Sequence, residues 1–481
     1  APNPDRDVTH VYSPGTYIED ISNDTLKNVI MCIYLETNKR HLGGYLLSLG
    51  ISMIDLSTGE NSVYETYAPY DDSSLALDEA YRYIHMYSPR EIMIYFKGVD
   101  GGPDYTREDL KHRFDIRNAL YTFSKGVPEK CNSLDYQNNF LGKIFHSGMI
   151  SPIEYVDLQR SPSGLISYIL LLRYSLDHDE TILKSINRPQ VLTNENHLIL
   201  ENNCIYQLNV IPDKNSRKSK VDSLASVIDG TSSSLGKRLL FHRILNPVTN
   251  ICELNSRYNI VEEFIHDDLW KRFEPYLKII FDIERLQRKI SLGRIHPSEF
   301  YNLNSSYEAI LKIFEILHKL SDGTKGALVP DDGLYDNFVK FMEYYHSIYE
   351  IDEMMRWNTT LIGSNIFKSG IYSEIDDIWN EICNINHFFD RIPLSLSGYI
   401  DKGGATVVKH EHNDRYGHYF CLTKKRSETL KQNLALAIKP IQYEDVIIKS
   451  NEFVYKYQGQ KCRLSSKQIS KKSDRLILLM D

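Results

Sequence analysis

The first third of the chain alternates between the two-residue spacing of strands and the 3.6-residue spacing of helices. Short apolar runs that predict strands lie at 28–35, 44–55, 61–67 and 91–96. Helical spacing is found at 75–86, near 107–123 and near 134–147. Three strands, a helix and a further strand therefore predict an α/β unit that covers residues 28–160.

Helical spacing dominates the middle of the chain. The segments with this spacing lie at 163–176, 223–244, 251–265, 269–292, 297–320, 332–357 and 371–389. A short element with strand character, residues 197–208, interrupts them. The length of the helical segments predicts an elongated all-α body over residues 161–394.

The pattern changes again near residue 393. Strand candidates lie at 407–409, 419–422, 445–450 and 453–457. Helical spacing returns over 465–479. The simplest architecture is a small all-β module, residues 395–463, inserted between two helical arms, of which the second is 464–481. With the irregular, proline-punctuated residues 1–27 as a linker, the predicted fold class is multidomain α+β.

Charge is distributed unevenly along the chain. The whole sequence carries a formal net charge of −8, yet residues 401–475 hold 16 Lys and Arg against 8 Asp and Glu. One basic module in an acidic chain indicates a local contact with a polyanion, and nucleic acid is the favoured one for an intracellular protein. A solvated lysine-rich surface explains the same charges and stays open as the alternative.

Several classes of protein are disfavoured by composition. No run of 18 or more apolar residues is present, and the first residues do not have the cationic and apolar regions of a signal peptide. The seven cysteines include no C-x-x-C pair, which argues against a zinc ribbon and a disulfide framework. We therefore expect an intracellular protein with no membrane contact.

Two local motifs suggest nucleotide or metal binding. Residues 230–238, GTSSSLGKR, resemble a phosphate-binding loop, but five residues separate the glycines and Arg238 stands where a hydroxyl residue is needed. We interpret this motif as the start of a helix. Three histidines gather beside Glu411, namely His410, His412 and His418. Zinc requires tetrahedral ligands at fixed spacing and a second shell, so we expect no metal there.

One carboxylate keeps a catalytic alternative open. Asp55 ends the second predicted strand, and Glu60 follows it. The order of strands in this unit matches an RNase H-like sheet, on which metal-dependent nucleases place three or four converging carboxylates. Convincing partners for Asp55 cannot be named from the sequence. An inert copy of the fold is favoured, and we predict no catalytic residue in the chain.

A series of short motifs resembles the MutS family of DNA mismatch repair proteins. SLASVIDGTSSSLGKRLL, residues 223–240, resembles the start of the family's core domain: a Leu–Asp–x–Thr segment, a glycine and Arg-Leu-Leu. Pro247 with residues 251–264 continues that pattern, and DIERL at 282–286 resembles the next signature. Further resemblances lie at Val11–Thr16, 197–203, Gly417–Phe420 and Arg463–Leu464. They run in the family's order from Val11 to the C-terminus.

The resemblance implies a division into named domains. These are a catalytically inert, RNase H-like connector at 28–160, a core with lever helices at 161–394, a clamp at 395–463 and a returning lever helix at 464–481. It also implies a mismatch-reading domain before Val11 and an ATPase, with ATP and magnesium, after Asp481. We therefore expect an excised or truncated middle of a family member; a natural paralogue without both ends is the alternative. Residues 160–172 resemble the giant-virus and octocoral-mitochondrial branch.

In the implied mechanism the clamp contacts the backbone of double-stranded DNA, because Lys and Arg neutralise phosphates without reading bases. The candidates are Lys409, Arg415, Lys424, Lys425, Arg426, Lys461, Arg463 and Lys467. The whole protein would be a DNA-dependent ATPase with a second MutS-type subunit. We expect this chain to be monomeric, without enzymatic activity and without a cofactor of its own.

Three further interpretations accompany this one. Phe341-Met342-Glu343 has the bare Phe-x-Glu pattern of mismatch readers, but it lies within a predicted helix, where we expect Phe341 to be a core residue. A metal-dependent nuclease around Asp55 remains one alternative function. A protein-interaction platform is the other.

Overall fold

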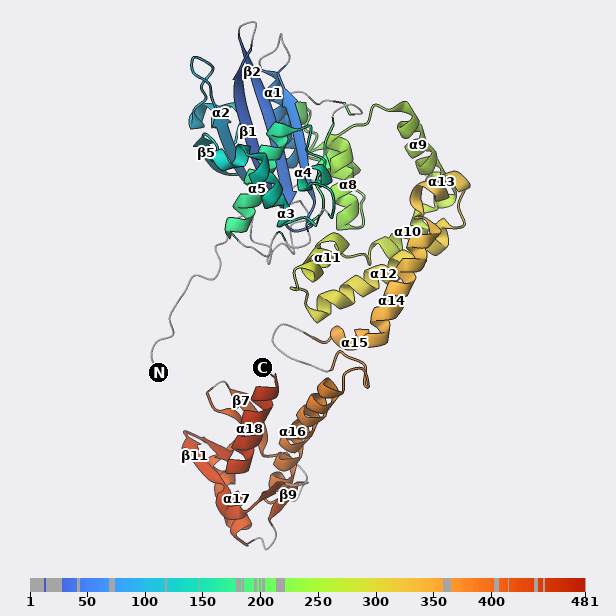
Figure 1. Ribbon diagram of the computed structural model, residues 1–481. Helices are drawn as coiled ribbons and strands as arrows, with labels where there is room; N and C mark the ends of the chain where they lie inside the picture. Colours follow the sequence, from blue (N-terminus) through green and yellow to red (C-terminus); the bar gives the residue numbers. More distant parts are fainter. Residues whose placement is uncertain are drawn as a thin grey trace. The chain divides into compact units, whose positions relative to one another are not determined.

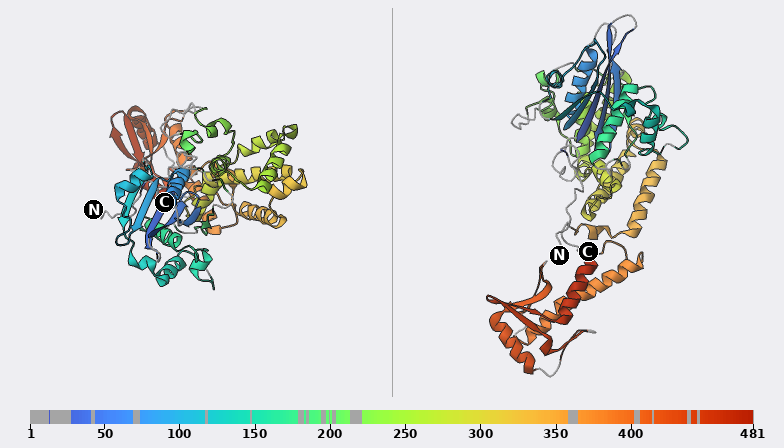
Figure 2. Two further views of the ribbon diagram at one scale, coloured as in Figure 1. Left: turned by 90° about the horizontal axis from the view of Figure 1, so that it is seen from above. Right: turned by 60° about the vertical axis from the view of Figure 1, so that its left-hand side comes forward.

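The computed structural model divides the chain into two units, residues 1–331 and 332–481, which are described separately (Figures 1 and 2). The structure describes residues 13, 28–40, 44–68, 74–116, 119–146, 148–178, 183, 186–193, 197–198, 200, 204–212, 221–357, 365–401, 406–413, 415–436, 440–443 and 446–480. The predicted linker 1–27 and the motif Val11–Thr16 lie outside these residues, except for Ser13.

A six-stranded mixed sheet organises the start of the first unit. Its strands are β1 (Val29–Lys39), β2 (Tyr45–Asp55), β3 (Asn61–Tyr67), β4 (Glu91–Lys97), β5 (Leu120–Lys125) and β6 (Gln190–Val191). Their order is β5-β4-β1-β2-β3-β6. β1, β2 and β3 pair antiparallel, whereas β4 is parallel to β1, β5 to β4, and β6 to β3. The predicted succession of three strands, a helix and a fourth strand is confirmed.

Both faces of this sheet are buried, which is why β1 reads as a continuous apolar run. Alternate residues of β1, Val29 to Leu35, pack with α1 (Leu75–Tyr87) in one apolar cluster. The residues between them, Ile30 to Tyr34, pack with α5 (Pro162–His178) in another. Figure 1 shows α1 and α5 beside the strands. We expected the α/β unit to end at residue 160, but α5 completes its core, because the helix is apolar on most of its circumference.

The crossing of α5 over β2 requires a residue without a side chain. A Cβ atom at Gly50 would lie 2.1 Å from the carbonyl oxygen of Ser163 and 2.6 Å from the amide nitrogen of Gly164. Both are backbone atoms at the start of α5. The carboxylate of Glu65 on β3 accepts the Gly164 N–H at 2.7 Å. Helix and sheet are therefore in backbone contact at this point.

The segment between β4 and α5 differs from the prediction. The expected helix near 107–123 is only α2 (Arg107–Arg113), which begins with a capping box at Thr106, and the rest forms β5. Leu120-Tyr-Thr-Phe has the aromatic and β-branched residues that fit a half-buried edge strand. The short helices α3 (Leu134–Gly142) and α4 (Pro152–Tyr155) follow.

The remainder of the first unit is helical. Its helices are α6 (Cys204–Gln207), α7 (Leu224–Ile228), α8 (Ser234–Leu245), α9 (Ile251–Ile265), α10 (Trp270–Leu277), α11 (Ile283–Ser291), α12 (Pro297–Leu317) and α13 (Asp322–Leu328). Two predicted helices, 223–244 and 269–292, are each broken in two. Ser233 and Asp282 accept backbone N–H groups at the starts of α8 and α11, so each break has its own cap.

The strand predicted at 197–208 is largely wrong. Of its described residues, only His197 makes a β-bridge, to Val248, and α6 occupies the end of the segment. The continuous all-α body predicted over 161–394 is also divided, because the boundary between the two units falls at residue 331.

The second unit combines helices with a four-stranded antiparallel sheet. Its helices are α14 (Asp332–Ile348), α15 (Ile351–Met354), α16 (Ser373–Gly398), α17 (Lys424–Leu436) and α18 (Lys467–Met480). The strands β7 (Lys409–Asn413), β8 (Gly417–Thr423), β11 (Val454–Gln458) and β12 (Lys461–Ser465) are ordered β11-β12-β8-β7. β9 (Ile441–Tyr443) pairs with β10 (Val446–Ile448).

The predicted all-β module contains a helix that the prediction missed. α17 buries only Ser427, Leu430 and Leu434, so its buried face consists of two leucines and a serine in a largely polar segment. With that correction, the module lies between α16 and α18 in the sequence, as expected. The chain as a whole contains both α and β elements. Among the described helices, none is long and apolar enough to cross a membrane.

Candidate nucleic-acid interface

The four-stranded sheet of the second unit has one apolar and one polar face. Phe420, Leu422 and Leu464 point toward an apolar cluster that also contains residues of α16, α17 and α18. Figure 1 shows α16 and α18 beside this sheet. Side chains alternate along a strand, so the residues between these point away from the three helices. We call this opposite side the outer face; its residues include Lys409, Glu411, Tyr419, Cys421, Lys456, Lys461 and Arg463.

Three cations form a row across the outer face. Lys456 on β11 pairs in register with Arg463 on β12, Arg463 pairs with Cys421 on β8, and Cys421 pairs with Lys409 on β7. Residues directly opposite each other in a sheet point to the same side. One row perpendicular to the strands therefore holds three cations and the buried thiol of Cys421.

A fourth cation and one carboxylate flank this row. Lys461 pairs with Thr423 in register, and its Nζ lies 3.5 Å from Oε1 of Glu411. The side chain of Lys461 is 70% exposed, so this ion pair is weak. Among its described residues, the outer face thus carries four cations, Lys409, Lys456, Lys461 and Arg463, against the single carboxylate of Glu411, and the net charge of these residues is positive.

Tyrosine rings hold two of the guanidinium groups at one end of the sheet. The guanidinium carbon of Arg463 lies 3.7 Å from the ring centre of Tyr416 and 5.7 Å from that of Tyr419. Arg415 lies 5.3 Å from the same Tyr416 ring. Such cation–π contacts orient a guanidinium group and leave its N–H donors available.

The structure does not bring all eight predicted DNA contacts together. Lys409, Lys461 and Arg463 lie on the outer face, and Arg415 lies in the adjoining β7–β8 turn. Lys424, Lys425 and Arg426 are exposed at the start of α17, beyond the other end of β8. Lys467 is the first residue of α18, which packs on the opposite side.

Sequence reasoning missed three residues of this surface, Lys456, Tyr416 and Tyr419. A signal for Lys456 was present in VYKYQ, residues 454–458, where the lysine alternates with two tyrosines. That alternation places Lys456 on the side opposite to Tyr455, which is partly buried against the apolar cluster. No comparable pattern distinguishes Tyr416, because it lies in a turn.

The side chains of the three histidines, His410, His412 and His418, lie on the face of the sheet opposite to the outer face. His410 Nε2 and His418 Nδ1 are 2.9 Å apart and share a hydrogen bond, and His410 stacks on Phe389 of α16. Burial, followed by the influence of His412 and His410, lowers the pKa of His418 to about 4. Burial also lowers the pKa of His410. Within the described ranges, no group of three or more His, Cys, Asp or Glu side chains could hold a metal ion.

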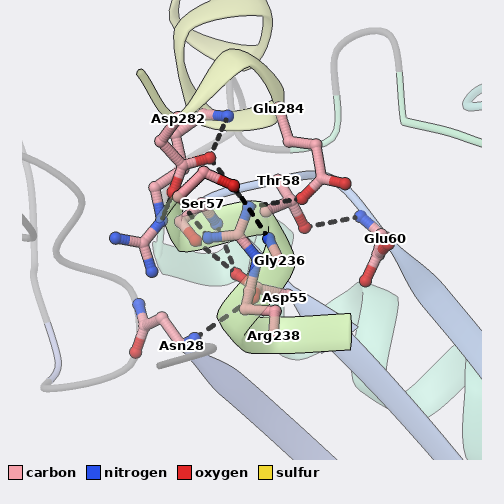
Figure 3. A network of polar contacts seen from close by, with 11 residues as sticks. Asn28, Asp55, Ser57, Thr58, Glu60, Gly236, Arg238, Asp282 and Glu284 are labelled. Atoms are coloured by element: carbon pink, nitrogen blue, oxygen red, sulfur yellow. Dashed lines mark hydrogen bonds and ion pairs between the residues drawn. The ribbon is translucent and has the colours of Figure 1, made fainter. Parts of the chain in front are cut away.

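The carboxylate of Asp55, the candidate for nuclease chemistry, is occupied by hydrogen bonds from neighbouring residues. Its carboxylate accepts the backbone N–H of Asn28 at 3.2 Å, and both the N–H and the hydroxyl of Ser57 at 2.9 and 2.6 Å (Figure 3). The residue is 3% exposed. These bonds give Asp55 a structural role at the end of β2, and they lend no support to the nuclease alternative.

Arg238, which stands where a phosphate-binding loop needs a hydroxyl residue, has a structural role. Its guanidinium donates to both carboxylate oxygens of Asp282, at 2.5 and 2.8 Å, and to Glu284 (Figure 3). Burial alone would raise the pKa of Asp282, but the hydrogen bonds and charge of Arg238 outweigh it and lower that pKa. Ser233 accepts the Gly236 N–H, so the motif is a helix start, as expected.

The prediction for Phe341 is wrong in one respect. The residue lies within α14, as expected, but its side chain is 49% exposed. The neighbouring Met342, at 5% exposure, takes the buried position, and the Phe341 ring packs edge-on against Tyr345.

Comparisons with known proteins show which proteins this chain is similar to. Residues 203–385 match the family described as MutS domain III. These residues comprise the helices from α6 to the first half of α16, including the Arg238–Asp282 pair. The resemblance inferred from the sequence is confirmed, and the chain is a relative of the MutS proteins.

Particular relatives match nearly the whole chain. A mutS homologue of Acanthamoeba polyphaga mimivirus, described as a DNA mismatch repair protein, is 29% identical over 94% of this chain and 43% of its own length. The DNA mismatch repair protein MutS of Persephonella marina is 25% identical over 93% of the chain and 47% of its own length. That of Clostridium tetani is 25% identical over 89% and 43%. The chain thus spans less than half of the length of these relatives, one of which belongs to a giant virus.

Proposed function

We propose that the chain is the DNA-binding middle portion of a MutS-type mismatch repair protein, in which residues 395–463 act as a clamp on the backbone of duplex DNA. The row of Lys456, Arg463 and Lys409 across the outer face is the observation that carries this proposal. Neighbouring strands lie about 4.8 Å apart, so the row extends about 14 Å. This length equals the axial rise of about four nucleotides of one DNA strand.

The chemistry of the outer face favours phosphate over base recognition. Its cations project from the strands of a sheet, and Glu411 is the single carboxylate among the described residues of that face. A cationic sheet surface can neutralise phosphates, whereas base recognition requires an element that enters a groove. The proposal therefore predicts affinity that depends on salt and does not depend on sequence.

The two helices that flank the clamp support a lever role. α16 leads into the module and α18 leads out of it, and the two are joined by Arg475, which donates to both oxygens of Glu381 at 2.8 and 2.7 Å. Two linked helices can carry a displacement to the sheet as one body. In this proposal the sheet of residues 28–160, with α5, is an inert RNase H-like connector, and no residue of the chain is catalytic. ATP and magnesium binding, and pairing with a second MutS-type subunit, belong to the whole family member.

The test is the salt dependence of duplex binding, measured by fluorescence anisotropy on the full chain. Neutralising one phosphate contributes about 0.9 to the slope of log affinity against log salt. The triple variant Lys409→Ala, Lys456→Ala, Arg463→Ala should lower that slope by up to about 2.7 and weaken binding at low salt. A flat salt response of the wild type would refute the proposal.

A matched control removes the same charge elsewhere. Lys271 on α10, Lys278 directly after α10 and Lys312 on α12 are exposed lysines of the first unit. Their replacement by alanine changes the net charge by the same amount as the clamp triple variant. If the control lowers the slope as much as the clamp variant does, DNA binds nonspecifically over the surface of the chain. The clamp assignment is then wrong.

A further inference from the structure

Tyr416 and Gly417, in the turn that joins β7 to β8, are tied to Asn413 and to α18. The Tyr416 N–H donates to the side-chain oxygen of Asn413 at 2.9 Å. Gly417 has φ of 65°, and a Cβ atom there would lie 2.3 Å from Oγ of Ser473 on α18. The Ser473 hydroxyl also receives the His418 N–H at 2.8 Å. The backbone that carries Tyr416 is therefore fixed on the body of the clamp.

Two like charges meet on the ring of Tyr416. Arg463 comes from β12 and Arg415 from the turn itself, and they lie 3.7 and 5.3 Å from the ring centre. Tyr419 adds a second ring beside Arg463, and the Asn413 amide donates to its hydroxyl at 3.2 Å. Two guanidinium groups repel each other unless an aromatic ring between them or a bound anion offsets their charge.

The N–H donors of both arginines remain available. Among the described residues, no carboxylate lies within ion-pair distance of Arg415 or Arg463. Stacking on a ring restricts the side chain without using the donors at the edge of the guanidinium plane. A pair of restrained guanidinium groups with free donors suits an anion that accepts several hydrogen bonds at once, such as a phosphate diester.

We infer that Tyr416 is a positioning residue for DNA binding: its ring holds Arg415 and Arg463 in place for a backbone phosphate. This inference rests on the proposed function and names the residue that orders its contact surface. Tyr416 carries no charge, so its effect differs from that of the arginines. It changes how well the cations are placed and not how many counterions the complex releases.

The first experiment examines the arginines without DNA. In the full chain labelled at arginine Nε, ring currents should shift the Nε–H resonance of Arg463 in the wild type and in Tyr416→Phe. The shift should collapse in Tyr416→Ala. An Arg463 resonance that is the same in the wild type and in Tyr416→Ala overturns the inference, whatever the affinity for DNA.

The second experiment measures duplex affinity against salt. We expect Tyr416→Ala to weaken binding about tenfold at fixed salt with the slope unchanged, and Tyr416→Phe to remain within twofold of the wild type. Arg463→Ala should lower the slope by about 0.9. Tyr344→Ala, which removes an exposed ring on α14, serves as the control and should leave binding unchanged.

The outcomes separate this inference from the proposed function. If the wild type shows no salt-dependent duplex binding, both the inference and the proposed function are refuted. If the wild type binds duplex DNA and Tyr416→Ala binds it equally well, only the inference is refuted. Equal weakening by Tyr416→Ala and Tyr416→Phe would assign the effect to the hydroxyl and overturn the role of the ring.

Discussion

Replacing Gly50 by alanine should uncouple α5 from the sheet of the first unit. The added Cβ would stand 2.1 Å from the carbonyl oxygen and 2.3 Å from the carbonyl carbon of Ser163, both backbone atoms. Ordinary contacts between such atoms are longer by more than 1 Å. Neither β2 nor the start of α5 has a flexible side chain at this point that could move aside. The helix itself must therefore move away from the strand.

The cost follows from the contacts that such a movement opens. A buried leucine makes about 40–60 atomic contacts of roughly 0.1 kcal/mol each, and a gap of 0.5–1 Å removes a quarter to a half of that energy. α5 presents Leu165, Ile169 and Leu172 to its apolar cluster. Losing a quarter of the contacts of two or three such side chains costs about 3 kcal/mol. This is at the upper end of the usual 1–3 kcal/mol for overpacking.

Hydrogen exchange is the appropriate assay, because a chain of two units is not expected to unfold in a single transition. Amides of β1, β2 and α5 should lose protection corresponding to about 3 kcal/mol, while those of α16 and α18 should keep theirs. Gly326→Ala in α13 is the matched control. Its Cβ would meet open space, and alanine favours a helix, so protection there should rise by up to about 1 kcal/mol. Protection of α5 in Gly50→Ala within 0.5 kcal/mol of the wild type would refute the reasoning.

Two further predictions concern buried polar groups. Arg238→Met leaves the carboxylates of Asp282 and Glu284 without their partner, so it should destabilise the first unit by about 3 kcal/mol in urea unfolding, and the double variant with Asp282→Asn should recover part of this loss. The pKa of His418 falls from its usual 6.5 to about 4 on folding, so the unfolded chain takes up a proton between these values that the folded chain does not. The second unit should thus be fully stable above pH 6.5 and lose stability as the pH falls toward 4; a urea midpoint of the second unit that is equal at pH 7.5 and pH 5 would contradict this assignment.

The predictability of each element follows from the clarity of its spacing and from the residues that end it. β3 and α9 have the predicted bounds, Asn61–Tyr67 and Ile251–Ile265. Turn or capping residues adjoin both segments, and both have clear spacing. β5 was mistaken for a helix because it is an edge strand in which only Tyr121 is buried, so its residues show no clear alternation. α17 was missed because it buries three residues, one of which is a serine. Local pattern gives the bounds of an element where the spacing is clear and turn or capping residues adjoin it, as in β3 and in the largely exposed α9.

The candidate site shows a further limit of local sequence pattern. Along the sequence, the densest run of the predicted DNA contacts is Lys424, Lys425 and Arg426. In the structure the aligned cations are instead Lys456 and Arg463, with Lys409, which come from three different strands. Their alignment depends on the register between two hairpins, β7–β8 and β11–β12, which residues 424–453 separate in the sequence. A sequence reports how many cations a module holds, but pairing between strands decides which of them share a face. For a sheet that binds a polyanion, register is therefore the property that defines the site, and variants chosen by register should affect DNA binding more than variants chosen by density.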